Sequence, residues 1–297
     1  MRISLLTIGL ALPAVLAAMP AQAKVVEITP SSRWNLDYGE TKCRLARLFG
    51  EGDAKHVLFL EQYWPGQRVG MTVAGPSFKR FASRARTDLA FAEGQEPRRT
   101  EPFAGAVEGY GDAVIYSQIN IGAALRDDAE EAAADATEDL TLPLLDKEGA
   151  RKAQFVGLKQ RGDEYRLMTG PLDQAFEALD ACALDLVGSW GLDAEAQRTA
   201  TRMPQWTNRD GVVRRIVATY PREAARTGEQ GIMRMRVIVS PEGKVEDCVI
   251  LKATETDRLD SPACRAMANA QFEPALDAAG QPMRSFFAES IVYQMGR

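Results

Sequence analysis

The residues of this 297-residue chain best suited to chemistry are its four cysteines, at Cys43, Cys182, Cys248 and Cys264. Their spacing forms neither a C-x-x-C pair nor the Cys/His pattern that is typical of a zinc site. An even number of cysteines in an exported protein favours disulfide bonds, and four cysteines allow three pairings. Free buried thiols are the alternative, and titration of the denatured protein with a thiol reagent distinguishes the two.

Other catalytic residue types give little support for an enzyme. The single histidine, His56, comes just before an apolar strand, so a catalytic triad or a histidine-rich metal site would depend on it alone. The chain lacks a G-x-S-x-G elbow, a Walker loop, a dinucleotide glycine fingerprint and an H-E-x-x-H helix. Asp37 and the pair Asp163-Glu164 are better explained as turn residues. We therefore expect no catalytic residues and no cofactor, with His56 at the surface or at a strand end. An exported hydrolase with a cleft around His56 or Asp37 remains the enzymatic alternative.

The charged residues argue against a metal site and against nucleic-acid binding. The run from Arg126 to Asp139 is strongly acidic, but its spacing does not match an EF-hand loop, so we interpret it as a solvated helix face and expect no metal site. The net charge of −5 argues against a general nucleic-acid binder, which needs clustered Lys and Arg to neutralise phosphates.

The first 23 residues are typical of a secretory signal. Met1-Arg2 supplies a positive charge, an apolar run extends from Ile3 to Ala18, and the small residues Ala21 and Ala23 precede the expected cleavage after Ala23. We therefore predict a periplasmic protein with no membrane span after cleavage. An uncleaved anchor is the alternative, because the run is near the lower length limit for crossing a bilayer.

The rest of the chain is expected to form two domains of the α+β class. The predicted units are a signal peptide (1–23), a strand-rich antiparallel domain of unrecognised family (24–191), a polar linker (192–217) and a small C-terminal domain (218–297).

The N-terminal domain shows short strand patterns separated by glycine-rich turns. Strands are predicted within 43–49, 57–60, 69–73, 88–92 and 113–121, which suggests an antiparallel sheet or a small barrel. The clearest helix runs from Leu172 to about Val187, with one apolar face that includes Cys182.

The C-terminal domain has the clearest local signals. Pro221 and Gly228 bracket a short helix, and a hairpin follows from Gly231 to about Leu251, with its turn at Pro241 to Lys244. A second helix to about Ala270 and a final strand from about 283 to 295 complete the order helix, hairpin, helix, strand. Cys248 and Cys264 fall within this one small unit, so we expect them to be bonded, which leaves Cys43 to pair with Cys182.

Residues 220–295 resemble the C-terminal domain of the TonB family. The turn and packing residues that carry the resemblance are Tyr220-Pro221, Ala224, Gly228, Gly231, Val237, Val239, Gly243, Val245, Val249, Leu259-Asp260, Ala263, Phe272, Pro274-Ala275, Gly280 and Pro282. The resemblance implies a periplasmic, non-catalytic domain that binds outer-membrane transport receptors by adding a receptor segment to an edge strand.

The chain departs from the energy-transducing members of that family. Such members typically have an uncleaved N-terminal helix carrying a histidine and a long proline-rich spacer, whereas the 15 prolines here are scattered. We therefore interpret the C-terminal unit as a binding domain, and the energy-transducer function would return only if residues 1–23 were retained.

The final strand is the predicted partner-binding edge. Along it we single out Phe287, Glu289, Ile291, Val292 and Tyr293, although the alternation does not indicate which face is buried. The expected partners are proteins of the cell envelope, including TonB-dependent receptors of transmembrane transport. A homodimer and a structural, peptidoglycan-associated role are the alternatives.

Overall fold

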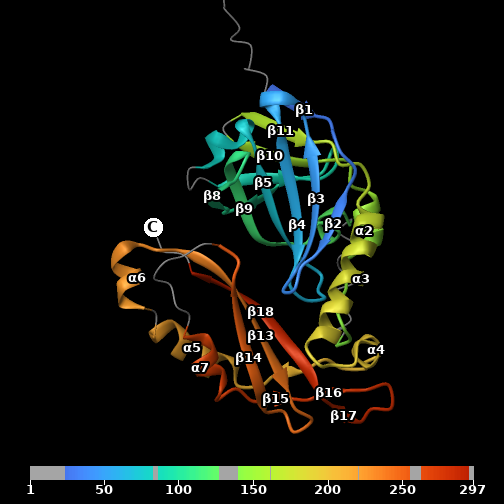
Figure 1. The fold of residues 1–297 in the computed structure, drawn as a ribbon, viewed down its shortest axis with the longest axis vertical. Coiled ribbons are helices and arrows are strands. Elements are labelled where there is room, and N and C mark those ends of the chain that lie inside the picture. Colours follow the sequence, from blue (N-terminus) through green and yellow to red (C-terminus); the bar gives the residue numbers. More distant parts are fainter. Residues whose placement is uncertain are drawn as a thin grey trace, which may run out of the picture.

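The computed structural model describes residues 24–82, 86–126, 140–160, 162–219, 221–254 and 262–293 (Figure 1). The predicted signal peptide (1–23), and the acidic run apart from Arg126, lie outside the described residues. So does Tyr220, with which the predicted family resemblance begins.

A six-stranded antiparallel sheet forms one layer of the N-terminal domain, with the order β2-β3-β4-β5-β9-β8. Its strands are β2 (Asn35–Tyr38), β3 (Cys43–Phe49), β4 (His56–Gln62), β5 (Val69–Ala74), β8 (Phe103–Val107) and β9 (Gly111–Ile119). Every second residue of β3 from Cys43 points inward, and Cys43, Leu45 and Phe49 are buried, which is the alternation expected of a strand. The strands predicted near 43–49, 57–60, 69–73 and 113–121 are therefore confirmed.

A five-stranded sheet forms the second layer, with the order β1-β11-β10-β6-β7. Its strands are β1 (Lys24–Ile28), β6 (Thr87–Ala90), β7 (Arg98–Thr100), β10 (Val156–Gln160) and β11 (Asp163–Leu167). β1 pairs with β11 in parallel, and the other three pairings are antiparallel. Leu58 of the first sheet and Leu158 of the second belong to one apolar cluster, so the two sheets share a core.

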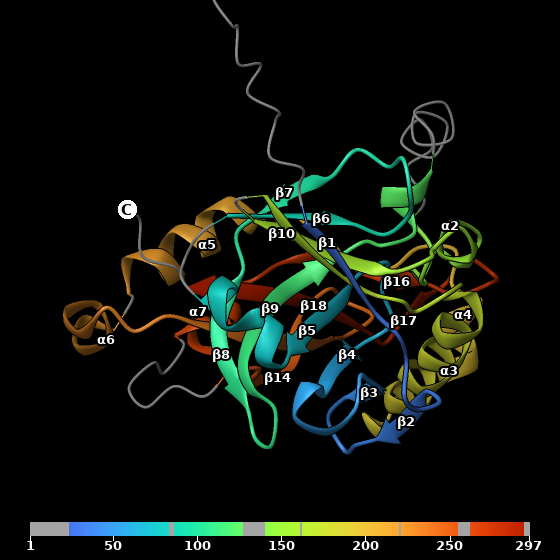
Figure 2. The same ribbon diagram turned by 90° about the horizontal axis from the view of Figure 1, so that it is seen from above.

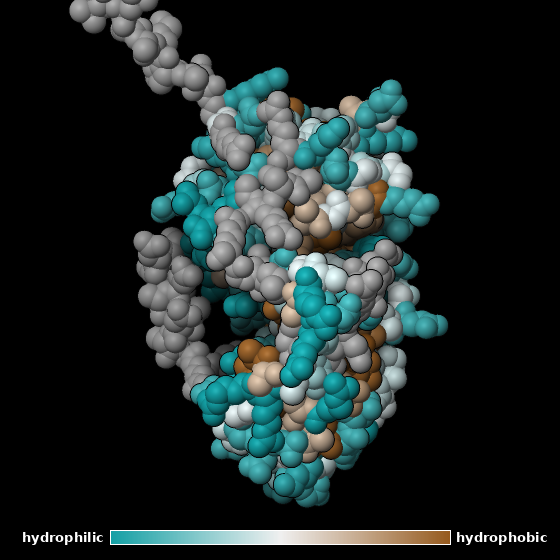
Figure 3. Space-filling view, turned by 90° about the vertical axis from the view of Figure 1, so that its left-hand side faces the viewer, coloured by the Kyte–Doolittle hydropathy of each residue, from teal (hydrophilic) through white to brown (hydrophobic). Residues whose placement is uncertain are grey.

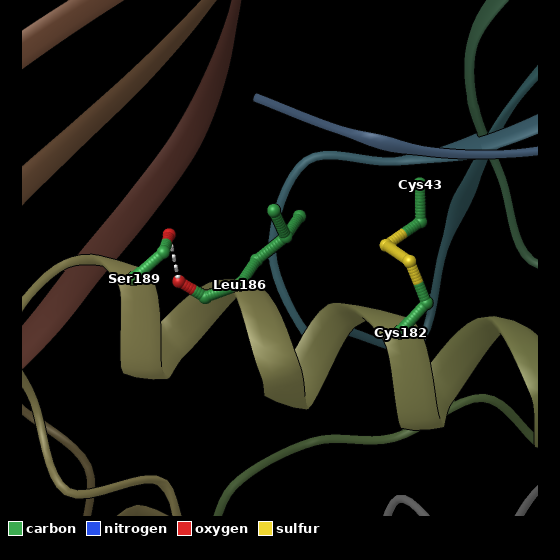
Figure 4. The surroundings of a disulfide bond; sticks show 4 residues. All are labelled: Cys43, Cys182, Leu186 and Ser189. Atoms are coloured by element: carbon green, nitrogen blue, oxygen red, sulfur yellow. Dashed lines mark hydrogen bonds between the residues drawn. A yellow bond between two sulfur atoms is a disulfide. The ribbon is translucent and has the colours of Figure 1, made fainter. Parts of the chain in front are cut away.

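The long helix α3 (Asp173–Ser189) closes the side of this core, as the apolar pattern of the sequence predicts. Cys182 of α3 is bonded to Cys43 of β3, which ties the helix to the first sheet (Figure 4). The smaller helical elements among the described residues of this domain include the 3₁₀ segments η1 (Gly52–Ala54), η2 (Pro76–Ala82) and η3 (Ala123–Leu125), and the short helix α2 (Lys147–Arg151).

One acidic residue of α3, Asp180, faces this core. It is only 4% exposed, and its Oδ1 accepts a hydrogen bond from the backbone N of Leu145 at 3.2 Å. Its Oδ2 and the Oε1 of the buried Gln62 have no hydrogen-bond partner among the described residues. Burial raises the pKa of Asp180 to about 6, against the smaller opposing effects of the Leu145 N–H, the charge of Lys147 and the polar side chain of Gln62.

Residues 192–217, predicted as an irregular linker, contain regular structure. They include the helix α4 (Ala194–Arg198), the short strand β12 (Gln205–Trp206) and most of the helix α5 (Arg209–Ala218). β12 pairs with β15 (Phe272–Glu273), and Val212 and Ile216 of α5 pack into the C-terminal core. These elements are short and gain their stability from packing against distant segments, which explains why the local sequence resembles a loop. Where the domain boundary falls stays a prediction.

The C-terminal domain is built on a three-stranded antiparallel sheet with the order β14-β13-β18. Its main elements are α6 (Arg222–Thr227), β13 (Gly231–Val239), β14 (Val245–Lys252), α7 (Ala263–Met267) and β18 (Ser285–Tyr293), and a small hairpin is formed by β16 (Ala275–Leu276) and β17 (Pro282–Met283). α6 ends at Gly228 with φ of +66°, as the bracketing residues predict. The predicted hairpin and the second predicted disulfide, Cys248–Cys264, are present.

The turn of this hairpin contains a glycine that no other residue can replace without strain. Gly243 has φ of +74°, and a Cβ at this position would lie 2.0 Å from the carbonyl oxygen of Phe272. The backbone N of Phe272 in turn donates to the carbonyl oxygen of Gly243 at 3.0 Å. The glycine therefore lets the turn approach β15 closely, which joins the hairpin to the segment after α7.

The two domains lie against each other, with α3 running from the N-terminal domain toward α4 and the C-terminal sheet (Figure 1). Seen from above, β9 and β5 of the N-terminal domain lie over β18 (Figure 2). Val187 near the end of α3 and Leu192 just beyond the helix pack with Ile238 of β13 and Phe286 of β18 in one apolar cluster. The C-terminal sheet is therefore covered by its own helices on one face and by the N-terminal domain on part of the other.

Candidate protein-binding edge

β18 lies at one edge of the C-terminal sheet and pairs only with β13 among the described strands. It begins at Ser285, two residues after the predicted start, because residues 282–283 pair separately in the β16–β17 hairpin. All five singled-out residues, Phe287, Glu289, Ile291, Val292 and Tyr293, lie on β18.

The hydrogen-bonding register indicates which amides of β18 point outward. The carbonyl oxygen of Ile232 in β13 accepts a hydrogen bond from the backbone N of Ala253, the residue after β14, at 2.9 Å. Ile232 therefore directs its backbone polar groups toward β14. Successive residues of a strand direct these groups to opposite sides, so Met233 directs its groups toward β18 and its partner Ile291. Odd-numbered residues of β18 are thus bonded to β13. The N–H and C=O groups of even-numbered residues, including Val292, point away from the sheet.

The odd-numbered side chains of β18 lie on the helical face. Phe287 packs with Trp206 and Phe272, at ring-centroid distances of 5.5 Å and 5.3 Å. Glu289 Oε1 forms an ion pair with Nη2 of Arg209 of α5 at 2.6 Å.

Two further residues complete this face. Ile291 packs against the core that contains Met235, and the buried Tyr293 packs with Ala224 of α6. Four of the five predicted residues therefore share this face, and only Val292 lies on the other.

The even-numbered side chains of β18 face the N-terminal domain. The ring of Phe286 lies 5.2 Å from that of Trp190, which follows α3. Ser290 accepts a hydrogen bond from Arg234 of β13, and Arg234 also reaches Ser117 of β9. Sequence analysis left the buried face of this strand undecided, and the structure shows that both faces are covered over much of its length.

Arg234 is the main polar contact between the domains. It is 4% exposed, and its two terminal nitrogens donate to Ser117, to Oγ at 3.2 Å and to the carbonyl oxygen at 2.6 Å. Its guanidinium carbon lies 5.1 Å from the centre of the Tyr63 ring. Burial lowers the pKa of Arg234, and the nearby Tyr63 and Glu61 partly oppose this effect. Gly70 leaves room for it, because a Cβ there would lie 3.1 Å from Nη2 of Arg234.

Glu61 is the carboxylate at the centre of this region. Its Oε1 lies 2.7 Å from Lys42 Nζ and 2.7 Å from Arg44 Nη2. Burial by itself raises the pKa of Glu61, but the charges and hydrogen bonds of Lys42 and Arg44 outweigh it and hold the pKa below its ordinary value. This cluster is therefore ionised and internally paired, which is typical of a structural ion network.

One groove, of about 430 Å³, runs between β18 and α5, and we call it the α5 groove. It is lined by Trp206, Arg209, Val213, Ile216, Val217, Met235 and residues 289–293 of β18. Two of its residues are among the most exposed large apolar residues described, Val217 at 68% and Val292 at 44%. Seen from the side of α5 and α6, apolar residues reach the surface in small patches between hydrophilic ones (Figure 3).

A second groove, of about 400 Å³, lies between the domains, and we call it the interdomain groove. It is lined by the turn 64–68, Gln118, residues 140–143 and 203–205, and residues 286–288 of β18. Sequence reasoning missed this groove because its lining comes from five separate segments, and none of them carries a recognisable motif. The two grooves together follow β18 from Phe286 to Tyr293.

The residues considered for catalysis lie away from both grooves. His56 begins β4, at a strand end as predicted, but it is buried rather than on the surface. Its Nε2 accepts a hydrogen bond from the backbone N of Ser77 at 3.2 Å, its ring packs edge-on against Phe78, and burial lowers its pKa. Asp37 is exposed on β2. Within the described ranges, no group of three or more His, Cys, Asp or Glu side chains is arranged to hold a metal ion.

The comparisons with known proteins concern the C-terminal domain. Among the residues that the structure describes, no helix combines the length and apolar character needed to cross a membrane. None of the curated proteins matches this chain in sequence. Residues 217–295 match the model of one family, described as Gram-negative bacterial TonB protein C-terminal. This segment, with β18 at the edge of its three-stranded sheet, is therefore a C-terminal domain of the TonB type, as the sequence predicted.

Proposed function

We propose that this protein is a periplasmic binding protein whose TonB-type domain captures an extended segment of an envelope protein by pairing it with β18. The class of partner we favour is an outer-membrane receptor of transmembrane transport. The observation that carries the proposal is the outer edge of β18, which directs alternate N–H and C=O groups away from β13 and lines a groove along its length. An added strand satisfies such groups with main-chain hydrogen bonds, and side-chain pockets then supply specificity.

The α5 groove supports this function energetically. An added strand would cover the exposed parts of Val217 and Val292, and complete burial of a valine side chain contributes about 1.5 kcal/mol. Arg209 and Glu289, the charged residues of the groove, are paired with each other. The rest of the lining, which includes Val213, Ile216 and Val217, is mostly apolar and suits an apolar side chain of a partner.

The compartment is part of the same proposal. We propose export through residues 1–23 with cleavage after Ala23, and the two disulfides support an oxidising compartment, because such bonds persist in the periplasm. Retention of residues 1–23 would instead support a membrane-anchored energy transducer. Sequencing the N-terminus of the purified protein distinguishes the two.

The test of the function uses a crosslinker in living cells. A photoreactive phenylalanine analogue replaces Val217, which lines the α5 groove without belonging to the sheet. We expect adducts with periplasm-facing segments of outer-membrane receptors, identified by mass spectrometry. Adducts only with a second copy of the chain, or only with cell-wall fragments, would refute receptor binding and favour the homodimer or the structural role.

A matched pair of variants shows whether β18 itself is responsible. Val292→Pro removes an N–H group that points outward, and proline is tolerated at such edge positions, so the fold should be retained. Val292→Ala keeps the N–H group and serves as the control. We expect adducts to be lost with Val292→Pro and kept with Val292→Ala, and equal adducts with both variants would exclude strand pairing. Ile291→Pro is unsuitable, because the amide of Ile291 is bonded to β13.

A further inference from the structure

The interdomain groove has an uncompensated positive charge. Arg68 is the only charged residue among its described lining residues, and it has no hydrogen-bond or ion-pair partner among the residues that the structure describes. The other polar side chains of the groove are neutral, namely Gln67, Gln118, Thr141 and Gln205. The groove therefore favours a ligand group with negative charge and hydrogen-bond acceptors.

Pairing geometry determines which residue of an added strand reaches this groove. Side chains directly opposite each other on paired strands lie on the same face of the sheet. Ala288 lies on the face that meets the N-terminal domain, as do Phe286 and Ser290, and it lines the interdomain groove. A partner residue opposite Ala288 would therefore point toward Arg68.

The same rule places a second partner residue in the α5 groove. Ile291 lies on the helical face and lines that groove beside Val213 and Val217. A partner residue opposite Ile291 would point toward these apolar side chains. Ala288 and Ile291 are three positions apart, and an odd spacing is required for two side chains on opposite faces of one strand.

We propose that the N-terminal domain helps to select the partner of the TonB-type domain. The partner strand carries an acidic residue opposite Ala288, which Arg68 recognises in the interdomain groove. It carries an apolar residue three positions away, which fills the α5 groove. This inference rests on the proposed strand pairing with β18, and it adds a contribution from a domain outside the family match.

The experiment selects ligands from a displayed library of random twelve-residue peptides on the full chain with both disulfides formed. We expect selected peptides to be enriched in an acidic and an apolar residue with two residues between them, in either order along the peptide. Hydrogen exchange of the complex should show new protection at the outward amides of Ala288 and Val292.

Charge reversal then tests the role of Arg68. For one synthetic selected peptide, Arg68→Glu should weaken binding about fivefold, because an exposed ion pair is replaced by repulsion. Replacing the acidic peptide residue with Lys should restore binding to Arg68→Glu but not to the wild type. Arg33→Glu, at an exposed position that lines neither groove, is the matched control and should leave binding unchanged.

The outcomes separate the two proposals. If no selected peptide protects the amides of β18, strand pairing itself is wrong. If peptides protect β18 but show no acidic enrichment, or bind Arg68→Glu and Arg33→Glu equally, only the selection by the N-terminal domain is overturned. Restoration of binding by the reversed charge pair would establish that Arg68 contacts the partner.

Discussion

Protonation of Asp180 in the buried interior of the N-terminal domain should make stability depend on pH. The pKa of this carboxyl group is raised from 3.8 to about 6, mainly by burial. Oδ2 of Asp180 also has no hydrogen-bond partner among the described residues that would favour the ionised form. The folded protein therefore favours the neutral carboxyl group, whereas the unfolded chain has no such preference.

The size and sign of the effect follow from linkage. The rise in the pKa of Asp180 to about 6 corresponds to roughly 3 kcal/mol of differential stability between the two protonation states. The pKa of Asp180 is higher in the folded protein than in the unfolded chain. Protonated Asp180 therefore makes its full contribution to the free energy of unfolding below pH 3.8, and this contribution is lost as the pH rises through about 6. Ionised Asp180 should therefore destabilise the protein at neutral pH. The variant Asp180→Asn, which cannot ionise, should be the more stable protein at pH 8.

Urea unfolding of the two proteins between pH 4 and pH 8, with both disulfides intact, measures this effect. We expect the stability difference between Asp180→Asn and the wild type to shift by up to about 3 kcal/mol in favour of the variant across this range. Asp185→Asn, which alters an exposed carboxyl group on the same helix, is the control. A difference that stays constant with pH for Asp180→Asn would refute the assignment of a raised pKa to this residue.

Three further changes test the structural framework, each by urea unfolding of the full chain. Replacing Cys248 and Cys264 with alanine removes a bond that spans 16 residues and should cost about 3 kcal/mol on the chain-entropy model, and no loss would mean that the bond does not form. Gly243→Ala should cost more than about 2 kcal/mol, whereas Gly280→Ala, with the same φ of +74° but open space around it, should cost only about 1 kcal/mol. Arg234→Met should cost about 2–4 kcal/mol and increase hydrogen exchange in β9 and β18, and unchanged exchange would exclude its role between the domains.

Much of the C-terminal fold was predictable because its signals are local. Pro221 and Gly228 mark the two ends of α6 by their own backbone preferences. The alternation in β13 separates the apolar residues of the core face from Arg234 and Arg236, and both arginines lie on the face that meets the N-terminal domain. The disulfide partners followed from redox chemistry and from their positions on predicted elements, and both bonds are present.

The candidate site was only partly predictable, because it depends on contacts between distant segments. The sequence indicated β18 as the edge, but the direction of the Val292 amide depends on pairing with β13, and the cover on each face depends on α5 and the N-terminal domain. The turn that contains Arg68 shows no motif and gains its position beside β18 only through domain packing. The sequence analysis also missed the strands β1, β7 and β8. Each is a short strand at the edge of a sheet, and such strands show little hydrophobic periodicity.

The Cys43–Cys182 bond has a mechanical consequence. It joins residues 139 positions apart, so a pulling force applied beyond both cysteines cannot extend the chain between them. A fully extended stretch of that length would span roughly 480 Å. With the bond intact, nearly all of this length is unavailable when the unfolded chain is stretched. If a bound partner pulled on β18, most of the N-terminal domain would lie inside a covalent loop and could not be drawn out. Stretching experiments on oxidised and reduced protein would show this loop directly as missing extension.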